Sequence, residues 1–273
     1  MAARDLYDAG MTAAGTTDGG AFPSFHLTNG QVDYEGEAVF SHLSLTIQPG
    51  EFAAILGENG SGKTTLMKAL LGLTPLSSGS SQIVGVDVGR FRDWTRVAYV
   101  PQRLLSAGAV PVSVLEVVRS ARTRPNRLFM GNADKAAAEL ALRKVNLWGR
   151  RHDRLDALSG GQQRRVMIAH ALAKGADIFV LDEPTAGIDH ESQRQLADVF
   201  STLRDDGATV LLVTHELGVF SRLATRVIVM QRRGARSVAY DGPPPAPAHL
   251  ADHAWHHSNE LAPLPEPSGL LEP

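Results

Sequence analysis

The chain has 273 residues, of which 43% are hydrophobic and 21% charged, and it contains no cysteine. This length accommodates one large α/β domain or two small ones, and the hydrophobic fraction is ordinary for a globular core. The 27 basic and 29 acidic residues give a net charge of -2, so no broadly basic surface for nucleic acid is expected. The absence of cysteine excludes a disulfide scaffold, a thiolate zinc site and an iron–sulfur cluster.

The N-terminal segment resembles neither a membrane anchor nor a secretory signal. No stretch of the chain approaches the roughly 20 apolar residues that a membrane-spanning helix needs. Residues 1–24 are rich in Gly, Ala and Thr and lack the continuous apolar core of a signal peptide. We therefore expect a flexible leader at 1–24 and a soluble, cytoplasmic protein.

The first ordered part of the chain, which should begin near Phe25, carries strand signals on both sides of a helix. Alternating apolar and polar residues, separated by Gly and Pro turns, indicate these strands. The expected elements are strands at His26–Tyr34, Leu43–Gln48 and Phe52–Leu56, a helix at Lys63–Leu71, and a further strand pair at Ile83–Val88 and Val97–Val100.

Helix signals replace strand signals between about residues 104 and 175. Ser113 is a candidate N-cap for a helix through Arg119, and a third helix should begin at Gly160. Between them, Asn132 or Asp134 is the candidate cap of a helix through Val145. The apolar stripe expected on that middle helix consists of Ala138, Leu140, Leu142 and Val145. This region therefore predicts a helical insert.

Strand signals return after the insert. Apolar runs at Ile178–Leu181, Val210–Val213 and Val227–Met230 flank a helix expected at Glu191–Arg204. Alternation of strands and helices predicts an α/β fold: a mostly parallel sheet with an antiparallel β subdomain and an inserted α-helical subdomain. One domain is expected over 25–242, followed by a tail at 243–273 that starts with a stiff proline-rich linker.

Residues 57–64 read GENGSGKT, which fits the phosphate-loop pattern G-x-x-x-x-G-K-[ST]. Glycines let successive N–H groups turn toward phosphate oxygens, and the following helix N-terminus adds partial positive charge. An ordinary glycine-rich turn is disfavoured because the loop lies between a strand and a helix. Lys63 is expected to reach the β- and γ-phosphates and Thr64 to ligate Mg²⁺. The residues expected to bind nucleotide here are Gly57, Asn59, Gly60, Ser61, Gly62, Lys63, Thr64 and Thr65.

Asp182 and Glu183 end the apolar strand Ile178–Leu181. Ligands of open α/β sheets bind beyond the carboxyl ends of the strands, so these acids should lie near the phosphates. Asp182 is expected to hold Mg²⁺, and Glu183 to polarise the water that attacks the γ-phosphate. An acidic turn before Pro184 is the alternative, and the phosphate loop disfavours it.

Residues 158–162 read LSGGQ, which resembles the signature of ATP-binding-cassette (ABC) ATPases. Further matches follow the family order. Gln102 resembles the Q-loop glutamine, Asp189 in AGID resembles the D-loop aspartate, His215 resembles the switch histidine, and Tyr34 occupies the place of the aromatic that stacks on adenine, with Phe40 as a rival.

This resemblance implies a phosphate-loop NTPase fold that uses ATP and Mg²⁺. In the family, two subunits meet head to tail, so each ATP also touches the partner's signature, here Ser159, Gly160, Gly161 and Gln162. The pair is a homodimer or two paralogues. Independently, Ser159 is a candidate N-cap whose helix end forms a second anion site. The resemblance assigns Gln102 to Mg²⁺ or the attacking water, and His215 to the γ-phosphate with Glu183.

Within the family, ATPases of DNA repair and chromosome maintenance have long coiled coils or Cys-rich zinc modules, and those of translation usually have two cassettes per chain. This chain has one cassette, no heptad run and no cysteine, so the resemblance indicates transport. It implies an ATP-hydrolysing motor on the cytoplasmic face of the membrane, docked on an integral membrane permease. An extracytoplasmic substrate-binding protein would deliver the solute to that permease. A regulatory or nucleic-acid-linked ABC ATPase is the alternative. Three arginine pairs are dispersed and balanced by acids, so we interpret them as solvated surface or pairing near phosphate, and expect no nucleic acid. They are Arg150–Arg151, Arg164–Arg165 and Arg232–Arg233.

The solute is indicated only by family likeness. Residues 97–102 (VAYVPQ) and 110–118 (VPVSVLEVV) resemble ATPases of bacterial zinc and manganese importers, while importers of iron-siderophores and other solutes stay open. The tail adds a group of four histidines. If the tail is helical, His249, His253 and His257 lie on one face and would bind zinc weakly, although a solvated polar tail is the favoured interpretation. The group consists of His249, His253, His256 and His257.

Overall fold

The computed structural model describes residues 21–102, 111–123, 131–233 and 236–244. Most of the expected leader at 1–24 and of the tail at 243–273, including its histidines, lies outside the described residues. So does part of the region expected as a helical insert. Within the described ranges, the structure contains no helix with the length and apolar character needed to cross a membrane.

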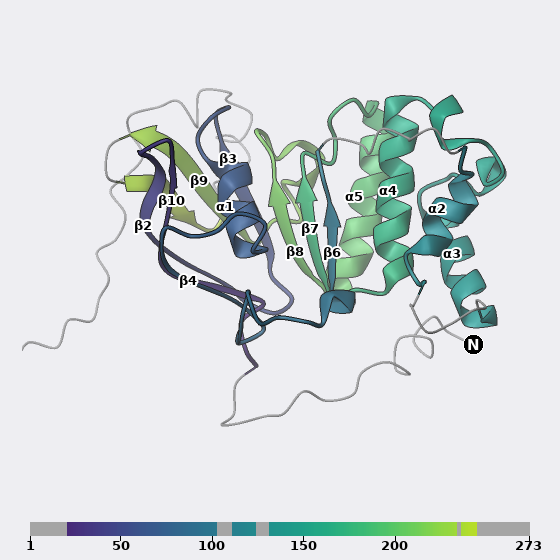
Figure 1. The fold of residues 1–273 in the computed structure, drawn as a ribbon. Coiled ribbons are helices and arrows are strands. Elements are labelled where there is room, and N and C mark those ends of the chain that lie inside the picture. The colour runs from purple at the N-terminus through teal and green to yellow at the C-terminus, as the bar shows by residue number, and fades with distance from the viewer. Residues whose placement is uncertain (1–20, 103–110, 124–130, 234–235, 245–273) are drawn as a thin grey trace, which may run out of the picture.

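Two β-sheets and a group of helices build the described chain (Figure 1). The larger sheet has strand order β10-β9-β3-β8-β7-β6, and the smaller has β2-β1-β4-β5. The strands are β1 (Phe25–Tyr34), β2 (Glu37–Ile47), β3 (Phe52–Gly57), β4 (Ser78–Ile83), β5 (Val86–Asp87), β6 (Val97–Val100), β7 (Ile178–Asp182), β8 (Thr209–Val213), β9 (Arg226–Arg233) and β10 (Arg236–Gly242). The α-helices are α1 (Lys63–Leu70), α2 (Val114–Ser120), α3 (Asn132–Lys144), α4 (Gly160–Lys174) and α5 (His190–Asp205).

The larger sheet is parallel except at β10, which pairs antiparallel with β9, and the smaller sheet is antiparallel. Helices α2, α3 and α4 gather at one end of the molecule, away from the smaller sheet (Figure 1). The expected fold class is confirmed, with its parallel sheet, antiparallel subdomain and helical subdomain. The edge strand β10 was not expected.

Two hydrophobic cores cover the two faces of the larger sheet. On β3, Phe52, Ala54 and Leu56 belong to the core that includes helices α2 to α5, whereas Ala53 and Ile55 belong to the core that includes α1 and the smaller sheet. A strand buried on both faces has a continuous apolar sequence, and this is why the central strands were recognisable.

The strand expected at Ile83–Val88 was wrong. β4 ends at Ile83, and the chain reverses at Val84 and Gly85, whose φ angles are 49° and 73°. Two consecutive positive φ angles are typical of a tight hairpin turn, so the apolar run is divided between β4 and the short β5. β6, expected to pair with this strand, lies in the larger sheet beside β7.

The helical insert has two of its three expected caps. Ser113 caps α2 and Ser159 caps α4, each with a reciprocal hydrogen bond to the residue three positions later. The cap expected at Asn132 or Asp134 was wrong: Gly131 is the N-cap of α3, and Asp134 accepts a hydrogen bond from its N–H. Leu140 was also wrong as a core residue, because it lies about 200° around the helix from buried Ala138 and is exposed.

Candidate functional site

The carboxyl ends of four parallel strands meet at one edge of the larger sheet. β3 leads into the glycine-rich loop, β6 into Gln102, β7 into Glu183, and β8 into Thr214 and His215. Since β7 and β8 pair in register, with Asp182 opposite Val213, their ends bring Glu183 beside Thr214. The topology therefore collects side chains that are far apart in the sequence.

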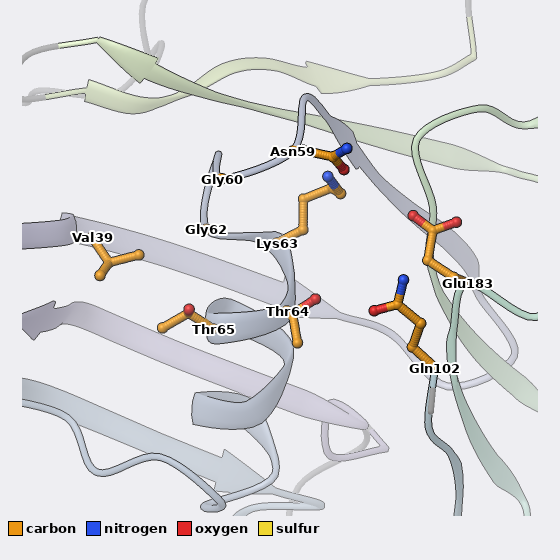
Figure 2. A pocket seen from close by; sticks show the side chains of 9 residues that line it. All are labelled: Val39, Asn59, Gly60, Gly62, Lys63, Thr64, Thr65, Gln102 and Glu183. Atoms are coloured by element: carbon orange, nitrogen blue, oxygen red, sulfur yellow. The ribbon is translucent and has the colours of Figure 1, made fainter. Parts of the chain in front are cut away.

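A pocket of about 210 Å³ lies at this edge (Figure 2). Glu183 and Gln102 face Lys63 and Thr64 from the opposite side of the pocket (Figure 2). The lining residues are Val39, Asn59, Gly60, Gly62, Lys63, Thr64, Thr65, Gln102 and Glu183. All of these except Val39 were expected in the site.

The glycine-rich loop takes a conformation that side chains would obstruct. Gly57 has φ 148°, and a Cβ on it would lie 2.4 Å from Met230 O and 2.6 Å from Ser61 Oγ. Gly62 has φ 94° and is the N-cap of α1. The Ser61 hydroxyl is buried and lacks a hydrogen-bond partner among the described residues. The loop therefore holds an uncommitted buried hydroxyl directly before a helix N-terminus, which suits an anionic ligand.

The Lys63 ammonium spans the loop from inside. Its Nζ donates to Gly57 O at 2.7 Å and to Glu58 O at 2.8 Å. Burial lowers the pKa of Lys63 from its ordinary value, and the nearby carboxylates of Glu183, Asp182 and Glu58 oppose that shift. A buried cation in this position attracts a phosphate strongly, because the surrounding dielectric constant is low.

Asp182 ends β7 and faces the start of α1. Thr64 Oγ1 donates to Asp182 Oδ1 at 3.5 Å. Burial, with a further contribution from the charge of Glu183, raises the pKa of the Asp182 carboxyl, whereas Lys68, the Thr64 hydroxyl and Arg164 act in the opposite direction. Hydroxyl, carboxylate and amide oxygens are the ligands that Mg²⁺ prefers, so Thr64, Asp182 and the pocket residue Gln102 fit this ion.

Glu183 is held by its main chain and its side chain. Its φ of 49° is in the left-handed region, and its N–H donates to Val213 O at 2.8 Å. Thr214 Oγ1 donates to Glu183 Oε2 at 3.3 Å, and His215 Nδ1 lies 3.1 Å from the same oxygen. The residues that follow β8 thus orient the Glu183 carboxylate, which lines the pocket, and the histidine beside it is exposed.

The LSGGQ residues lie outside the pocket lining. Gln162 N–H donates to Ser159 Oγ at 3.4 Å, and Gln162 Oε1 accepts from Ser159 N–H and from Arg150. Ser159 and Gly160 are exposed. Gly161 approaches another segment so closely that a Cβ on it would be 2.8 Å from Gly187 O. The start of α4 is therefore rigidly capped and open to solvent.

Three other expected residues also have defined places. Tyr34 ends β1 and is 71% exposed, whereas its rival Phe40 is 1% exposed, so Phe40 has no face for a ligand. Asp189 is the N-cap of α5, where its Oδ1 accepts from Ser192 N–H at 2.9 Å. Tyr34 and Asp189 are absent from the pocket lining, and His215 reaches the pocket only through Glu183.

Sequence reasoning missed Val39, Thr214 and Arg164. Val39 precedes buried Phe40 on β2, so strand alternation directs it to the opposite face, toward the phosphate loop. The Arg164–Arg165 pair was interpreted as solvated surface or pairing near phosphate, but Arg164 is 5% exposed and donates to main-chain carbonyls. The sequence signal that could have indicated a buried Arg164 is its position about one turn after the N-cap Ser159 of α4.

The fold and the pocket define a phosphate-loop ATPase, and comparison with known proteins gives the family. The ABC transporter family model matches residues 40–186. The zinc uptake system ATP-binding protein ZurA of Listeria innocua is 34% identical over 220 residues, which cover 79% of this chain and 84% of that protein. The manganese transport system ATP-binding protein MntB of Bacillus subtilis is 39% identical over 198 residues, covering 70% and 76%.

Solved structures agree with these relatives. A dimeric structure of a bacterial ABC transporter cassette superposes with a TM-score of 0.70 at 26% identity, covering 81% of this chain and 99% of that one. The chain therefore belongs to the ABC transporter family, as an ATPase.

Proposed function

We propose that the chain is the ATP-hydrolysing motor of an importer that moves a divalent metal ion, zinc or manganese, through a separate membrane permease. The observation that carries the ATP-hydrolysing part of the proposal is the pocket in which Lys63 and Thr64 face Glu183 and Gln102. Relatives at 34% and 39% identity, named for zinc uptake and manganese transport, favour these metals over iron-siderophores. The motor would lie on the cytoplasmic face of the membrane, and an extracytoplasmic binding protein would deliver the metal ion to the permease.

Nucleotide binding is the first step of the proposed mechanism. The N–H groups of the glycine-rich loop and of the α1 N-terminus surround the phosphates, with the Ser61 hydroxyl among them. Lys63 exchanges its bonds to Gly57 O and Glu58 O for the β- and γ-phosphates, and the exposed ring of Tyr34 stacks on adenine. The role of Lys63 is supported by its place in the pocket lining, and that of Tyr34 by its exposure at the end of β1.

Hydrolysis is the second step. Glu183 accepts a proton from the attacking water, while Thr214 and His215 fix its carboxylate. Thr64, Asp182 and Gln102 would hold Mg²⁺, which neutralises charge on the phosphates when bound. Lys63 stabilises the charge that develops on the transferred group.

A second cassette completes the proposed site. Ser159 and Gly160 are exposed and lie outside the pocket of their own chain, so a head-to-tail partner would present them, with Gly161 and Gln162, to the bound ATP. Asp189, which caps α5, would lie at the same contact. The partner is a second copy or a paralogous ATPase.

The catalytic assignment is tested with Glu183→Gln, and with Glu216→Gln as the matched control. Both substitutions remove one carboxylate near His215, but Glu216 is exposed and outside the pocket lining. Glu183→Gln is expected to lose ATP hydrolysis at least 100-fold and to accumulate as an ATP-bound dimer in size-exclusion chromatography. Hydrolysis by Glu183→Gln at the rate of the parent would contradict the assignment.

The transport assignment is tested in membrane vesicles that contain the permease, the binding protein and this chain. ATP-dependent uptake of labelled zinc or manganese is expected, and Glu183→Gln should abolish it. Uptake of an iron-siderophore without either metal would reject the proposed solute. An active ATPase that does not co-purify with any polytopic membrane protein would reject transport itself.

A further inference from the structure

Arg164 occupies an unusual position for an arginine in the ATPase core. It lies in the second turn of α4, after the Ser159 cap, and is 5% exposed. Burial lowers its pKa from the ordinary value, and the charges of Asp182 and Glu183 oppose that shift. A buried guanidinium is costly unless its donors are satisfied, so the bonds it makes indicate why the chain retains it.

Among the described residues, the hydrogen bonds of the Arg164 guanidinium end on main-chain carbonyls of the candidate catalytic segments. Nη1 donates to Glu183 O at 2.7 Å and to Asp182 O at 3.4 Å, and Nη2 donates to Gln102 O. These segments follow β7 and β6, which are neighbouring strands. One planar group therefore joins the start of α4 to both strand ends.

The bond to Glu183 O acts on an unfavourable backbone conformation. Glu183 has φ 49°, a left-handed value that residues with a side chain seldom adopt outside glycine, asparagine and aspartate. Such a conformation persists only where surrounding bonds determine it. Val213 O fixes the peptide group before Glu183, and the carbonyl after it accepts from Arg164 at 2.7 Å and from Ala186 N–H at 3.2 Å. Arg164 is the one side chain among these three partners, and its bond is the shorter of the two to the carbonyl.

We propose that Arg164 is a positioning residue for hydrolysis, whose guanidinium fixes the main chain of Glu183 and Gln102 relative to the start of α4. The inference rests on the proposed function for the roles of those two residues. Arg164 itself does not line the pocket. Its loss should therefore slow turnover while leaving nucleotide binding by the phosphate loop intact.

The experiment compares Arg164→Met, Arg164→Lys and the control Arg122→Met in the full chain. Arg122 is partly buried, pairs with Asp134 at 2.9 Å and, like Arg164, donates to a main-chain carbonyl. Its acceptor, Ala173 O at 3.3 Å, lies at the far end of α4 from Arg164. Measurements are kcat and KM for ATP, affinity for a fluorescent ATP analogue, thermal unfolding, and hydrogen exchange of peptides covering residues 178–188.

Arg164→Met is expected to lower kcat at least tenfold, with analogue affinity within threefold of the parent and faster exchange at 183–188. Arg164→Lys, which keeps the charge but loses the planar fork, should retain part of the rate. Arg122→Met should lower only the unfolding temperature. If Arg164→Met does not fold, Arg164→Lys supplies the comparison of kcat with affinity.

Parent-like kcat in both Arg164 variants would overturn the inference. So would a loss of kcat that matches the loss of affinity and of folded protein, because that pattern describes a purely structural residue. Failure of the parent to hydrolyse ATP would instead reject the proposed function. In that case exchange at 183–188 still decides the role of Arg164, and unchanged exchange in Arg164→Met would overturn it.

Discussion

Adjacent glycines at the start of α4 should respond oppositely to alanine. A Cβ on Gly160 would meet open space, whereas a Cβ on Gly161 would lie 2.8 Å from the main-chain oxygen of Gly187. Alanine in a helix gains up to about 1 kcal/mol over glycine, and this gain applies to both positions. At Gly161 the overpacking adds a cost of about 1–3 kcal/mol, because a backbone oxygen cannot rotate away.

Thermal unfolding of Gly160→Ala and Gly161→Ala measures this difference. Taking about 2 kcal/mol between them, and about 2–4 °C per kcal/mol for a domain of this size, Gly161→Ala should unfold about 4–8 °C below Gly160→Ala. Both variants add one methyl group at a helix position, so the gain in helix propensity cancels when their unfolding temperatures are compared. Equal unfolding temperatures would refute the close approach of α4 to Gly187.

Three other substitutions, the first with a matched control, separate binding, catalysis and stability. Tyr34→Ala should weaken ATP binding by about 1–3 kcal/mol through loss of stacking, seen as a raised Kd, whereas Phe40→Leu should leave Kd unchanged. Thr214→Val removes the bond to Glu183 Oε2 and should lower kcat by about tenfold or more at constant Kd in steady-state assays. Leu212→Ala, in the buried centre of β8, should cost about 2–5 kcal/mol in denaturant unfolding without changing kcat per folded molecule.

The sequence predicts the parts of the fold whose signals are local. Apolar runs such as Phe52–Leu56 mark strands that are buried on both faces, and Ser113 and Ser159 mark helix starts through their own side chains. The run at Ile83–Val88 misled because a hairpin turn can include an apolar residue such as Val84. β10 was missed because its strand pairing is set by the edge of the sheet rather than by its own periodicity.

The same distinction applies to the site. Lys63, Thr64, Gln102 and Glu183 line one pocket, as their motifs predict. The role of Arg164 could not be predicted from the sequence, because its bond to Gln102 joins residues that are 62 positions apart. Two consecutive arginines are, moreover, typical of a solvent-exposed part of a helix. The contact of Thr214 with Glu183 likewise depends on the register of β7 and β8, which no short pattern encodes.

The division of the apolar interior has a consequence for natural variation in this ATPase. Ala53 and Ile55 share their core with α1, which carries Lys63, whereas Phe52 and Ala54 share theirs with α4. A residue change that loosens the first core weakens support for the loop that receives nucleotide. A change that loosens the second reaches the helix that opens with the LSGGQ serine. Sequence variants of similar severity will therefore differ in phenotype according to the side of β3 on which they fall.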